Sequence, residues 1–319
     1  MKQTHRPPLV ILTGPTAAGK SDLSIALAER IGGEIISADS MQVYRHMDIG
    51  SAKITPAQMG GIPHHLIDVM EPCEEFNVVT FQRMAKQALE GIYGRGRIPV
   101  IVGGTGFYIQ ALLYDIDFTE NDEDVSLRAQ LEEIAESQGS EALYERLRSI
   151  DPESCNTIHA HNVKRVIRAI EFYEKTGTKI SEHNEKQRQN PSPYNAAYFV
   201  LNDDRGKLYA KIDARVDAMM AQGLVTEVAS LAALGCTRDM VSMQGLGYKE
   251  ILDYLDGKTT LEEAVYLIKR DTRHFAKRQL TWFRRERDVV WIDKGAFLYD
   301  NDRISEYMLT LLKDRNIIN

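Results

Sequence analysis

The chain alternates short apolar runs with segments of helical periodicity over most of its length. The apolar runs predict buried strands at Leu9–Leu12, Ile35–Ile36, Leu66–Ile67, Pro99–Val102, Ala197–Leu201 and Val289–Ile292. Helical spacing lies between most of them, as in Phe81–Tyr93, and predicts a closing helix at Ile304–Leu312. Alternating strands and helices indicate a parallel sheet covered on both faces, so we expect an α/β fold.

The alternation stops between residues 117 and 190. Apolar residues there follow helical spacing in three stretches, marked by Leu127, Leu131 and Ile134, by Leu143 and Leu147, and by Val163, Val166, Ile167 and Ile170. The stretch ends at Asn190-Pro191-Ser192-Pro193, and the strand pattern resumes near Tyr198. We therefore expect residues 1–116 to form the first part of a core, 117–190 a helical insertion, and 191–319 the second part with C-terminal helices.

Composition is that of an ordinary globular protein, with 43% hydrophobic and 27% charged residues among 319. No apolar run approaches the roughly 18–20 residues of a membrane span, and no signal peptide is visible. Cys73, Cys155 and Cys236 are odd in number and widely spaced, which argues against disulfides and zinc. We expect a cytoplasmic protein with no membrane partner.

Charge is distributed unevenly. The net charge of −7 argues weakly against a nucleic-acid partner. Residues 269–287, however, hold eight Lys and Arg against two acids, and residues 164–188 hold seven against four. A locally basic face can attract a polyanion, because screening limits distant charges to about 8–10 Å. Solvated helix faces explain such clusters equally well.

The strongest motif is a complete G-x-x-x-x-G-K-S that directly follows the first predicted strand and opens a helical pattern. It consists of Gly14, Pro15, Thr16, Ala17, Ala18, Gly19, Lys20 and Ser21. In this context the backbone N–H groups of the loop converge on phosphate oxygens, the lysine supplies a positive charge and the serine hydroxyl a magnesium ligand. The motif predicts a di- or triphosphate ligand without fixing the reaction.

Two further residues follow predicted strand ends, where ligands bind in open α/β sheets. Asp39 could hold magnesium through water or accept a proton from a nucleophile; a helix N-cap is the alternative, although Ser40 could serve as the cap instead. The glycines of Gly103–Gly106 would bring backbone close to a ligand and aim the hydroxyl of Thr105 into the same crevice. A threonine where a kinase would often carry an acid weakens an ATP-hydrolysis interpretation.

The remaining candidates are less specific. The glycine-rich turn Gln244–Lys249 suits either an interhelical loop or close approach to an unpaired base. Arg215, on a predicted helix, is expected in a surface ion pair. Trp282 fits helix packing by default and RNA stacking as the alternative. The histidine pairs lack metal-site spacing.

Together these motifs resemble the tRNA dimethylallyltransferases, which prenylate the adenosine on the 3′ side of the anticodon (adenosine 37). The resemblance covers essentially the whole length and rests on Gly14–Ser21, Asp39–Tyr44, Met47–Lys53, Gly103–Gly106, Lys164–Arg168, Gln244–Lys249 and Lys277–Trp282. It implies a P-loop NTPase-like sheet with an insertion that clasps the anticodon stem. It also implies dimethylallyl diphosphate as donor and Mg²⁺ on Ser21. The eukaryotic C-terminal zinc finger is missing, which points to the bacterial form, and a monomer is expected.

The resemblance further implies a role for individual residues. It gives Asp39, Thr105, Lys20 and Arg215 as catalytic and Gly14–Ser21 as diphosphate-binding. It gives as tRNA-binding Asp39, Ser40, Met41, Gln42, Thr105, Arg128, Lys164, Arg165, Val166, Ile167, Arg168, Gln244, Gly245, Leu246, Gly247, Tyr248 and Lys249. Three alternatives remain at this point: a P-loop nucleotide or metabolite kinase, an adenylate isopentenyltransferase, and a non-catalytic RNA chaperone.

Overall fold

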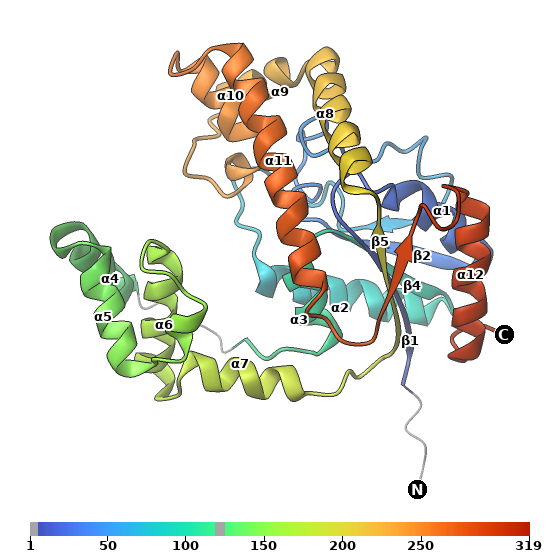
Figure 1. Ribbon diagram of the computed structural model, residues 1–319, viewed down its shortest axis with the longest axis horizontal. Helices are drawn as coiled ribbons and strands as arrows, with labels where there is room; N and C mark the ends of the chain where they lie inside the picture. Colours follow the sequence, from blue (N-terminus) through green and yellow to red (C-terminus); the bar gives the residue numbers. More distant parts are fainter. Residues whose placement is uncertain (1–5, 119–124) are drawn as a thin grey trace, which may run out of the picture. The chain divides into compact units, whose positions relative to one another are not determined.

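The computed structural model describes residues 6–118 and 125–319, which divide into two compact units. One unit runs to Leu113 and resumes over Ser192–Asn319, and it contains the sheet (Figure 1). The other unit is Tyr114–Pro191 and is helical. The chain therefore leaves the sheet-containing unit once, after its third helix, and returns before its fifth strand.

Within the described residues, six parallel strands form one sheet in the order β3-β2-β4-β1-β5-β6. They are β1 (Pro8–Thr13), β2 (Gly33–Ala38), β3 (His64–His65), β4 (Ile98–Gly103), β5 (Asn195–Asn202) and β6 (Val289–Asp293). The α/β class is confirmed, and five strand predictions hold. The strand predicted at Leu66–Ile67 is wrong by two residues. Leu66 has φ 64°, outside the range of a strand, and its side chain is buried, so its apolar character reports burial without strand structure.

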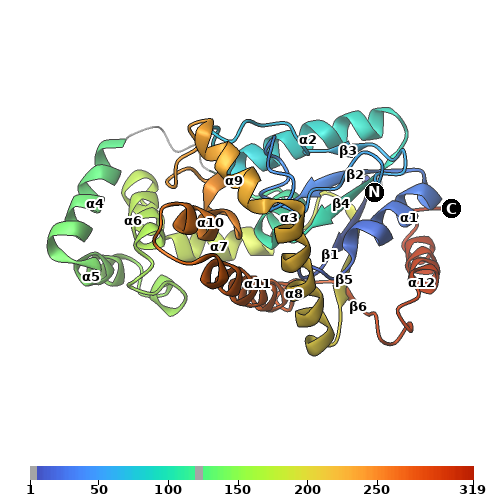
Figure 2. The ribbon, with the colours of Figure 1, turned by 90° about the horizontal axis from the view of Figure 1, so that it is seen from above.

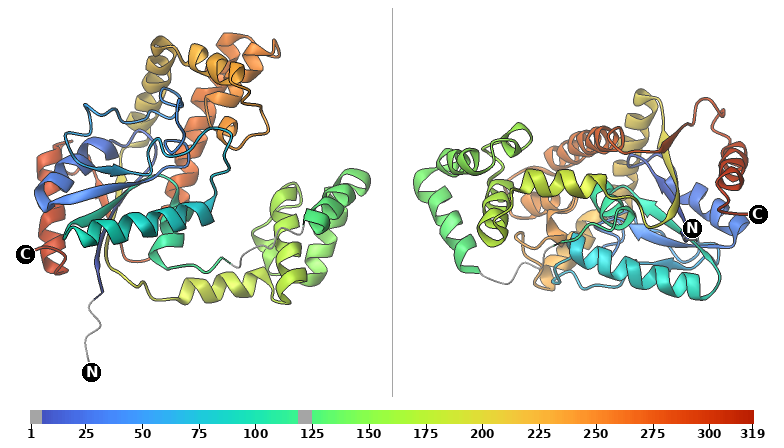
Figure 3. Two further views of the ribbon diagram at one scale, coloured as in Figure 1. Left: turned by 180° about the vertical axis from the view of Figure 1, so that it is seen from behind. Right: turned by 90° about the horizontal axis from the view of Figure 1, so that it is seen from below.

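The sheet is covered on both faces. Val10 and Leu12 of β1 pack in one core with α1 (Lys20–Ile31) and α12 (Asn301–Asp314). Leu9 and Ile11 are equally buried and point the other way, since side chains alternate along a strand. The views in Figures 2 and 3 show α2 (Val78–Gly94) and α3 (Gly106–Leu113) on that opposite side. Burial on both faces explains why the strands read as uninterrupted apolar runs.

Four helices extend beyond the carboxyl ends of the strands (Figure 1). They are α8 (Arg205–Gln222), α9 (Leu224–Ala233), α10 (Tyr248–Leu255) and α11 (Leu261–Phe283). A capping box at Thr260 and Glu263 starts α11, which packs against α3, α8 and α10. None of the described helices is long and apolar enough to cross a membrane. This arrangement brings Gln279 of α11 into contact with the loops that follow β1 and β4.

The helical unit consists of α4 (Val125–Gln138), α5 (Ser140–Ile150), α6 (Val163–Thr176) and α7 (Ile180–Gln189). Its core contains Leu131, Leu143, Leu147, Val166, Ile167, Ala169 and Ile170, which confirms the three predicted stretches. The buried carboxylate of Asp151 ties the unit together by accepting hydrogen bonds from the backbone and hydroxyl groups of Ser154 and Ser181. The sequence did not predict α7, because after Ile180 it has no apolar stripe.

Candidate functional site

The motif Gly14–Ser21 forms the loop between β1 and α1. Gly14 has φ 149°, and a Cβ there would lie 2.8 Å from the carbonyl oxygen of Leu201. Gly19 precedes α1 with a left-handed φ of 83°. Among the described residues, no side chain caps the first turn of α1. Its backbone N–H groups are therefore available to an anion.

Lys20 folds back over this loop. Its Nζ donates to the first two carbonyl oxygens of the loop, at 3.0 and 2.8 Å. Burial and the neighbouring charge of Arg215 lower the pKa of Lys20 to about 8, while Asp39 acts in the opposite direction. The ammonium is thus poorly compensated, and a phosphate group would compensate it better than the carbonyl oxygens do.

Arg215 reaches the loop from α8. Its Nη1 lies 3.4 Å from Oγ1 of Thr16, and the side chain is half-buried. Burial lowers its pKa, and the charge of Asp39 partly offsets this effect. The surface ion pair expected for Arg215 is therefore wrong. The residue is a second cation beside the loop.

Asp39 follows β2 in a turn that its own side chain stabilises. Oδ1 accepts the backbone N–H groups of Met41, at 2.8 Å, and Gln42, at 3.3 Å. This corrects the expectation that Ser40 would take the capping role and leave the carboxylate free, because no helix begins here. The other oxygen, Oδ2, has no hydrogen-bond partner within the described residues and remains available for chemistry.

The loop and the acid meet in one small cavity. It has a volume of about 50 Å³, and its lining includes Lys20, Ser21, Asp39, Gln42 and Gly103. A lysine, a hydroxyl, a carboxylate and an amide therefore converge at the carboxyl ends of β1, β2 and β4. Sequence segments far apart in the chain are combined here into one polar site.

Thr105 immediately precedes α3 and lies against the end of β2. Its backbone N–H donates to the carbonyl oxygen of Ala38, at 3.2 Å, which joins the end of β4 to the end of β2. Gly103, two residues earlier, packs against the same carbonyl group: a Cβ on Gly103 would lie 2.3 Å from the carbonyl oxygen of Ala38. Thr105 is half-buried at this junction.

The other glycines of this turn make room for α11 rather than for a ligand, contrary to the sequence-based expectation. A Cβ on Gly104 would lie 2.2 Å from Nε2 of Gln279. A Cβ on Gly106 would lie 2.2 Å from Cδ1 of Trp282. The indole also makes an edge contact with Phe107, so Trp282 is a packing residue, as its default interpretation predicted.

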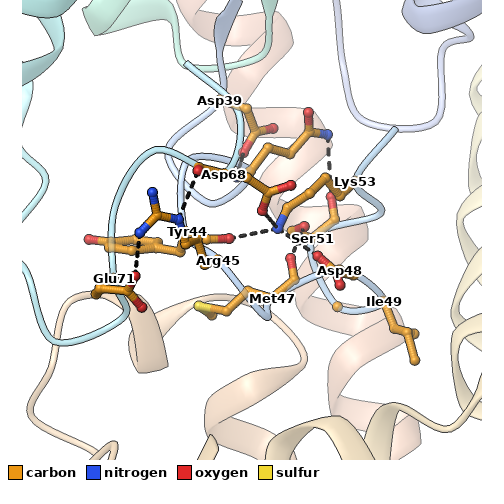
Figure 4. Close-up of polar contacts among 12 residues, drawn as sticks. Asp39, Tyr44, Arg45, Met47, Asp48, Ile49, Ser51, Lys53, Asp68 and Glu71 are labelled. Carbon is orange, nitrogen blue, oxygen red and sulfur yellow. Dashed lines mark hydrogen bonds and ion pairs between the residues drawn. The ribbon is translucent and has the colours of Figure 1, made fainter. Parts of the chain in front are cut away.

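The segment after Asp39 is held by a buried lysine (Figure 4). Nζ of Lys53 donates to the carbonyl oxygen of Tyr44 at 2.6 Å and contacts the carboxylates of Asp48 and Asp68 at 2.6 and 2.5 Å. Arg45 adds hydrogen bonds to Asp68 and Glu71. The Met47–Lys53 motif thus supports the segment that follows Asp39, which we call the wall of the site (residues 44–53), and none of its residues lines the cavity.

Glu227 of α9 joins this wall to the turn Gln244–Lys249. Its carboxylate accepts three backbone N–H groups from residues 48–50 and the hydroxyl of Tyr248, at 2.8 Å. Tyr248 is fully buried, and its ring lies where a Cβ on Gly50 would stand. Its expected contact with an unpaired base is therefore wrong, because no face of the ring is exposed.

The rest of the turn lies near Asp39. A Cβ on Gly245 would meet Cε of Met41 at 2.5 Å, so two of the predicted RNA-binding segments touch. Gln244 is exposed and donates to the carbonyl oxygen of Arg238, while Leu246 and Lys249 are half-buried. Gly247 has a left-handed φ of 96° before α10.

The remaining predicted RNA-binding residues belong to the helical unit. Lys164, Arg165 and Arg168 are exposed on α6. Val166 and Ile167 are buried at 0% and 3% exposure, so their side chains form core and the predicted contact through them is wrong. Arg128 makes a two-pronged ion pair with Glu171 at 3.0 and 2.8 Å. This pair gives Arg128 a structural role within the unit, and its tRNA contact stays a prediction.

Comparison with known proteins identifies the family. The family model described as IPP transferase matches residues 42–286, and the model described as isopentenyl transferase matches residues 7–70. A tRNA dimethylallyltransferase of Lachnoclostridium phytofermentans is 60% identical over 311 residues, 98% of this chain and 99% of that protein. The chain belongs to the IPP transferase family.

Solved IPP transferases share the fold. The full-length tRNA isopentenylpyrophosphate transferase of Bacillus halodurans is 43% identical with a TM-score of 0.73, covering 98% of both chains. The Staphylococcus epidermidis enzyme is 40% identical with a TM-score of 0.71, covering 97% of this chain and 99% of that one. A eukaryotic dimethylallyltransferase acting on tRNA is 31% identical with a TM-score of 0.77. The match covers 90% of this chain and 74% of the eukaryotic chain.

Three residues around the site of this IPP transferase were not singled out from its sequence. Glu227 holds the wall, Lys294 lies 3.3 Å from the carbonyl oxygen of Ala18, and Gln279 contacts two loops. Only Gln279 carried a usable signal. It lies three residues after buried Ala276 and four before buried Phe283, so helical spacing places this amide on the buried stripe of α11.

Proposed function

We propose that this IPP transferase moves the dimethylallyl group of dimethylallyl diphosphate to N6 of adenosine 37 in tRNA, giving N6-dimethylallyladenosine and diphosphate. Its relatives are named tRNA dimethylallyltransferase and tRNA isopentenylpyrophosphate transferase. The observation that carries the proposal is the cavity that Lys20 and Ser21, the last two residues of the loop, share with Asp39. An anion cradle beside a proton acceptor suits transfer of a group away from a diphosphate.

The loop side of the cavity would bind the donor's diphosphate. Backbone N–H groups at the start of α1 offer hydrogen bonds, and Lys20 and Arg215 offer positive charge. As the C1–O bond of the donor stretches, negative charge grows on the departing oxygen. Fixed donors and cations stabilise that charge more than they stabilise the intact substrate, and the hydroxyl of Thr105 would add a further donor.

The acid side would activate the nucleophile. The lone pair of N6 forms the new N–C1 bond while the C1–O bond breaks and diphosphate leaves with both bonding electrons. N6 then carries one proton too many, which Oδ2 of Asp39 would accept and pass to solvent. Oδ1 keeps the turn in place throughout, because it accepts two backbone N–H groups.

The oxygen donors near the loop fit a magnesium ion. The hydroxyl of Ser21 and the carboxylate of Asp39 line the same cavity, and Mg²⁺ prefers oxygen ligands with several contributed by phosphate and water. Ser21 would hold the ion directly, and oxygens of the diphosphate and of water would complete its coordination. The ion would supply further charge stabilisation to the diphosphate.

The RNA would present its adenine from the other side. A stacked base cannot reach a recessed carboxylate, so it must swing out, which costs a few kcal/mol and least in a loop. The contact between Met41 and Gly245 suits Asp39–Gln42 and the Gln244–Lys249 turn, apart from the buried Tyr248, to receive that base. Lys164, Arg165 and Arg168 would contact phosphates, which position RNA without reading its sequence.

One experiment separates this function from its competitors. Purified protein is incubated with tRNA and dimethylallyl diphosphate, and the digested nucleosides are analysed by mass. We expect one C5 prenyl unit on adenosine, located next to the anticodon by fragmentation. Prenylated free AMP or ADP, with tRNA unmodified, would indicate an adenylate isopentenyltransferase. Transfer of labelled phosphate from ATP without prenylation would indicate a kinase. A cytoplasmic location and a monomeric state stay predictions of the sequence.

A further inference from the structure

Gln279 is a buried polar residue of α11, and both polar atoms of its amide make a hydrogen bond to backbone. Its Oε1 accepts the backbone N–H of Thr16, at 2.8 Å, and its Nε2 donates to the carbonyl oxygen of Gly104, at 3.0 Å. These partners fix the orientation of the amide, because a backbone N–H can only donate and a carbonyl oxygen can only accept. The side chain is 6% exposed.

The two partners belong to the two halves of the proposed site. Thr16 is the third residue of the diphosphate loop, and its hydroxyl also contacts Arg215. Gly104 immediately precedes Thr105, whose backbone N–H donates to the carbonyl oxygen of Ala38, next to Asp39. The amide of Gln279 therefore connects the loop proposed to bind the leaving diphosphate with the turn next to Asp39, the proposed proton acceptor.

Two glycines leave the space that Gln279 and its neighbour Trp282 occupy. Gln279 and Trp282 are three residues apart on α11, so they share one face of the helix. A Cβ on Gly104 would lie 2.2 Å from Nε2 of Gln279, and a Cβ on Gly106 would lie 2.2 Å from Cδ1 of Trp282. The helix can approach the turn this closely only because Gly104 and Gly106 carry no side chain.

We propose that Gln279 is a positioning residue for prenyl transfer, which sets the separation between the diphosphate loop and the Gly103–Thr105 turn beside Asp39. It would touch neither substrate, because the side chain is buried and both of its polar atoms bond to backbone. The inference rests on the proposed function. A misplacement of about 1 Å between reacting groups costs roughly 100-fold in rate, so loss of the bridge should lower kcat.

The first test removes the bridge and keeps the volume. Gln279→Met has a similar shape without hydrogen bonds, and we expect kcat to fall about 10- to 100-fold while the Kd for tRNA stays within about twofold. Gln82→Met is the matched control, since Gln82 is also buried and its Nε2 donates to the carbonyl oxygen of Ala111 at 2.9 Å. The control should lose similar thermal stability and keep kcat within about twofold.

The second test uses a variant whose hydrogen bonds to both backbone partners can form only when the new side chain is protonated. In Gln279→Glu, a protonated carboxyl offers one donor and one acceptor, as the amide does, whereas a carboxylate would repel the carbonyl oxygen of Gly104. Burial would raise the pKa of the new group and Arg215 would lower it, so kcat is measured from about pH 5 to about pH 9. We expect the ratio of variant to wild-type kcat to fall as pH rises.

Two results would overturn the inference: wild-type kcat in Gln279→Met, or a Gln279→Glu ratio that does not change with pH. A kcat loss in Gln82→Met equal to that in Gln279→Met would also overturn it, since the effect would then follow stability. Absence of prenyl transfer by the wild-type protein would instead contradict the proposed function, so the two failures are distinguishable.

Discussion

Replacing Asp39 by Asn separates the two roles of its carboxylate. Oδ1 accepts the backbone N–H groups of Met41 and Gln42, and an asparagine carbonyl oxygen can accept the same bonds. Oδ2 would become an NH₂ group, which cannot take a proton from N6. The variant therefore keeps the turn and removes the base.

The size of the effect follows from these roles. General base catalysis contributes about 10²- to 10⁴-fold, or roughly 2.7–5.4 kcal/mol, so kcat of Asp39→Asn should fall by that factor. Its free energy of unfolding should stay near wild type. Asp39→Ala should lose the same factor in kcat and in addition about 1 kcal/mol of stability, the typical net value for a lost side-chain hydrogen bond.

Three measurements on the two variants check this account. Single-turnover rates of prenylation report the chemical step, urea denaturation reports stability, and filter binding reports tRNA affinity, which should change only several-fold. Near-wild-type turnover in Asp39→Asn would refute the role of Asp39 as base. Equal losses in turnover and tRNA affinity would show that Asp39 acts mainly through the structure of the turn.

Three other changes test separate parts of the account. Because the pKa of Lys20 is about 8 without ligand, an anion should be bound with proton uptake, and the Kd for dimethylallyl diphosphate should rise about tenfold between about pH 7 and about pH 9. Lys53→Met removes three contacts of a buried ammonium group and should lower the free energy of unfolding by about 1–3 kcal/mol in urea. Arg165→Ala and Arg168→Ala should each reduce the slope of log Kd for tRNA against log salt concentration by about 1.

Each change has a control. Lys20→Met should abolish the pH dependence, and a profile that persists in it would assign the titration elsewhere. Lys258→Met removes ion pairs of an exposed lysine and should cost under about 1 kcal/mol; an equal loss at Lys53 would contradict its role as a buried anchor. Arg30→Ala, on α1, should leave the salt slope unchanged, and an unchanged slope in Arg165→Ala would remove that residue from the RNA interface.

Periodicity and motif context predicted most of the sheet and the loop at its edge. The strands are buried on both faces, so they read as apolar runs, and the loop motif follows the first of them directly. The short β3 was misplaced because apolar character reports burial, and Leu66 is buried in a turn. No apolar periodicity predicts α7, because after Ile180 the helix contributes no apolar side chain to the core.

The site was harder to predict where contacts join distant segments. Arg215 looked like a surface residue because its partner Thr16 lies 199 positions away, and no local pattern reports that. Tyr248 looked available for stacking because its burial depends on Glu227 and Gly50. The glycines around Thr105 were assigned to a ligand, although their neighbours are side chains of α11.

The central claim is that the diphosphate loop and the carboxylate of Asp39 act on the same reacting centre from opposite sides. A crystal structure with an anticodon stem-loop and an unreactive dimethylallyl thiodiphosphate tests it directly. We expect diphosphate oxygens on the N–H groups of Gly14–Ser21 and N6 of the extruded adenine about 3 Å from Oδ2 of Asp39. Diphosphate bound away from the loop, or an adenine amino group facing away from this carboxylate, would contradict the account.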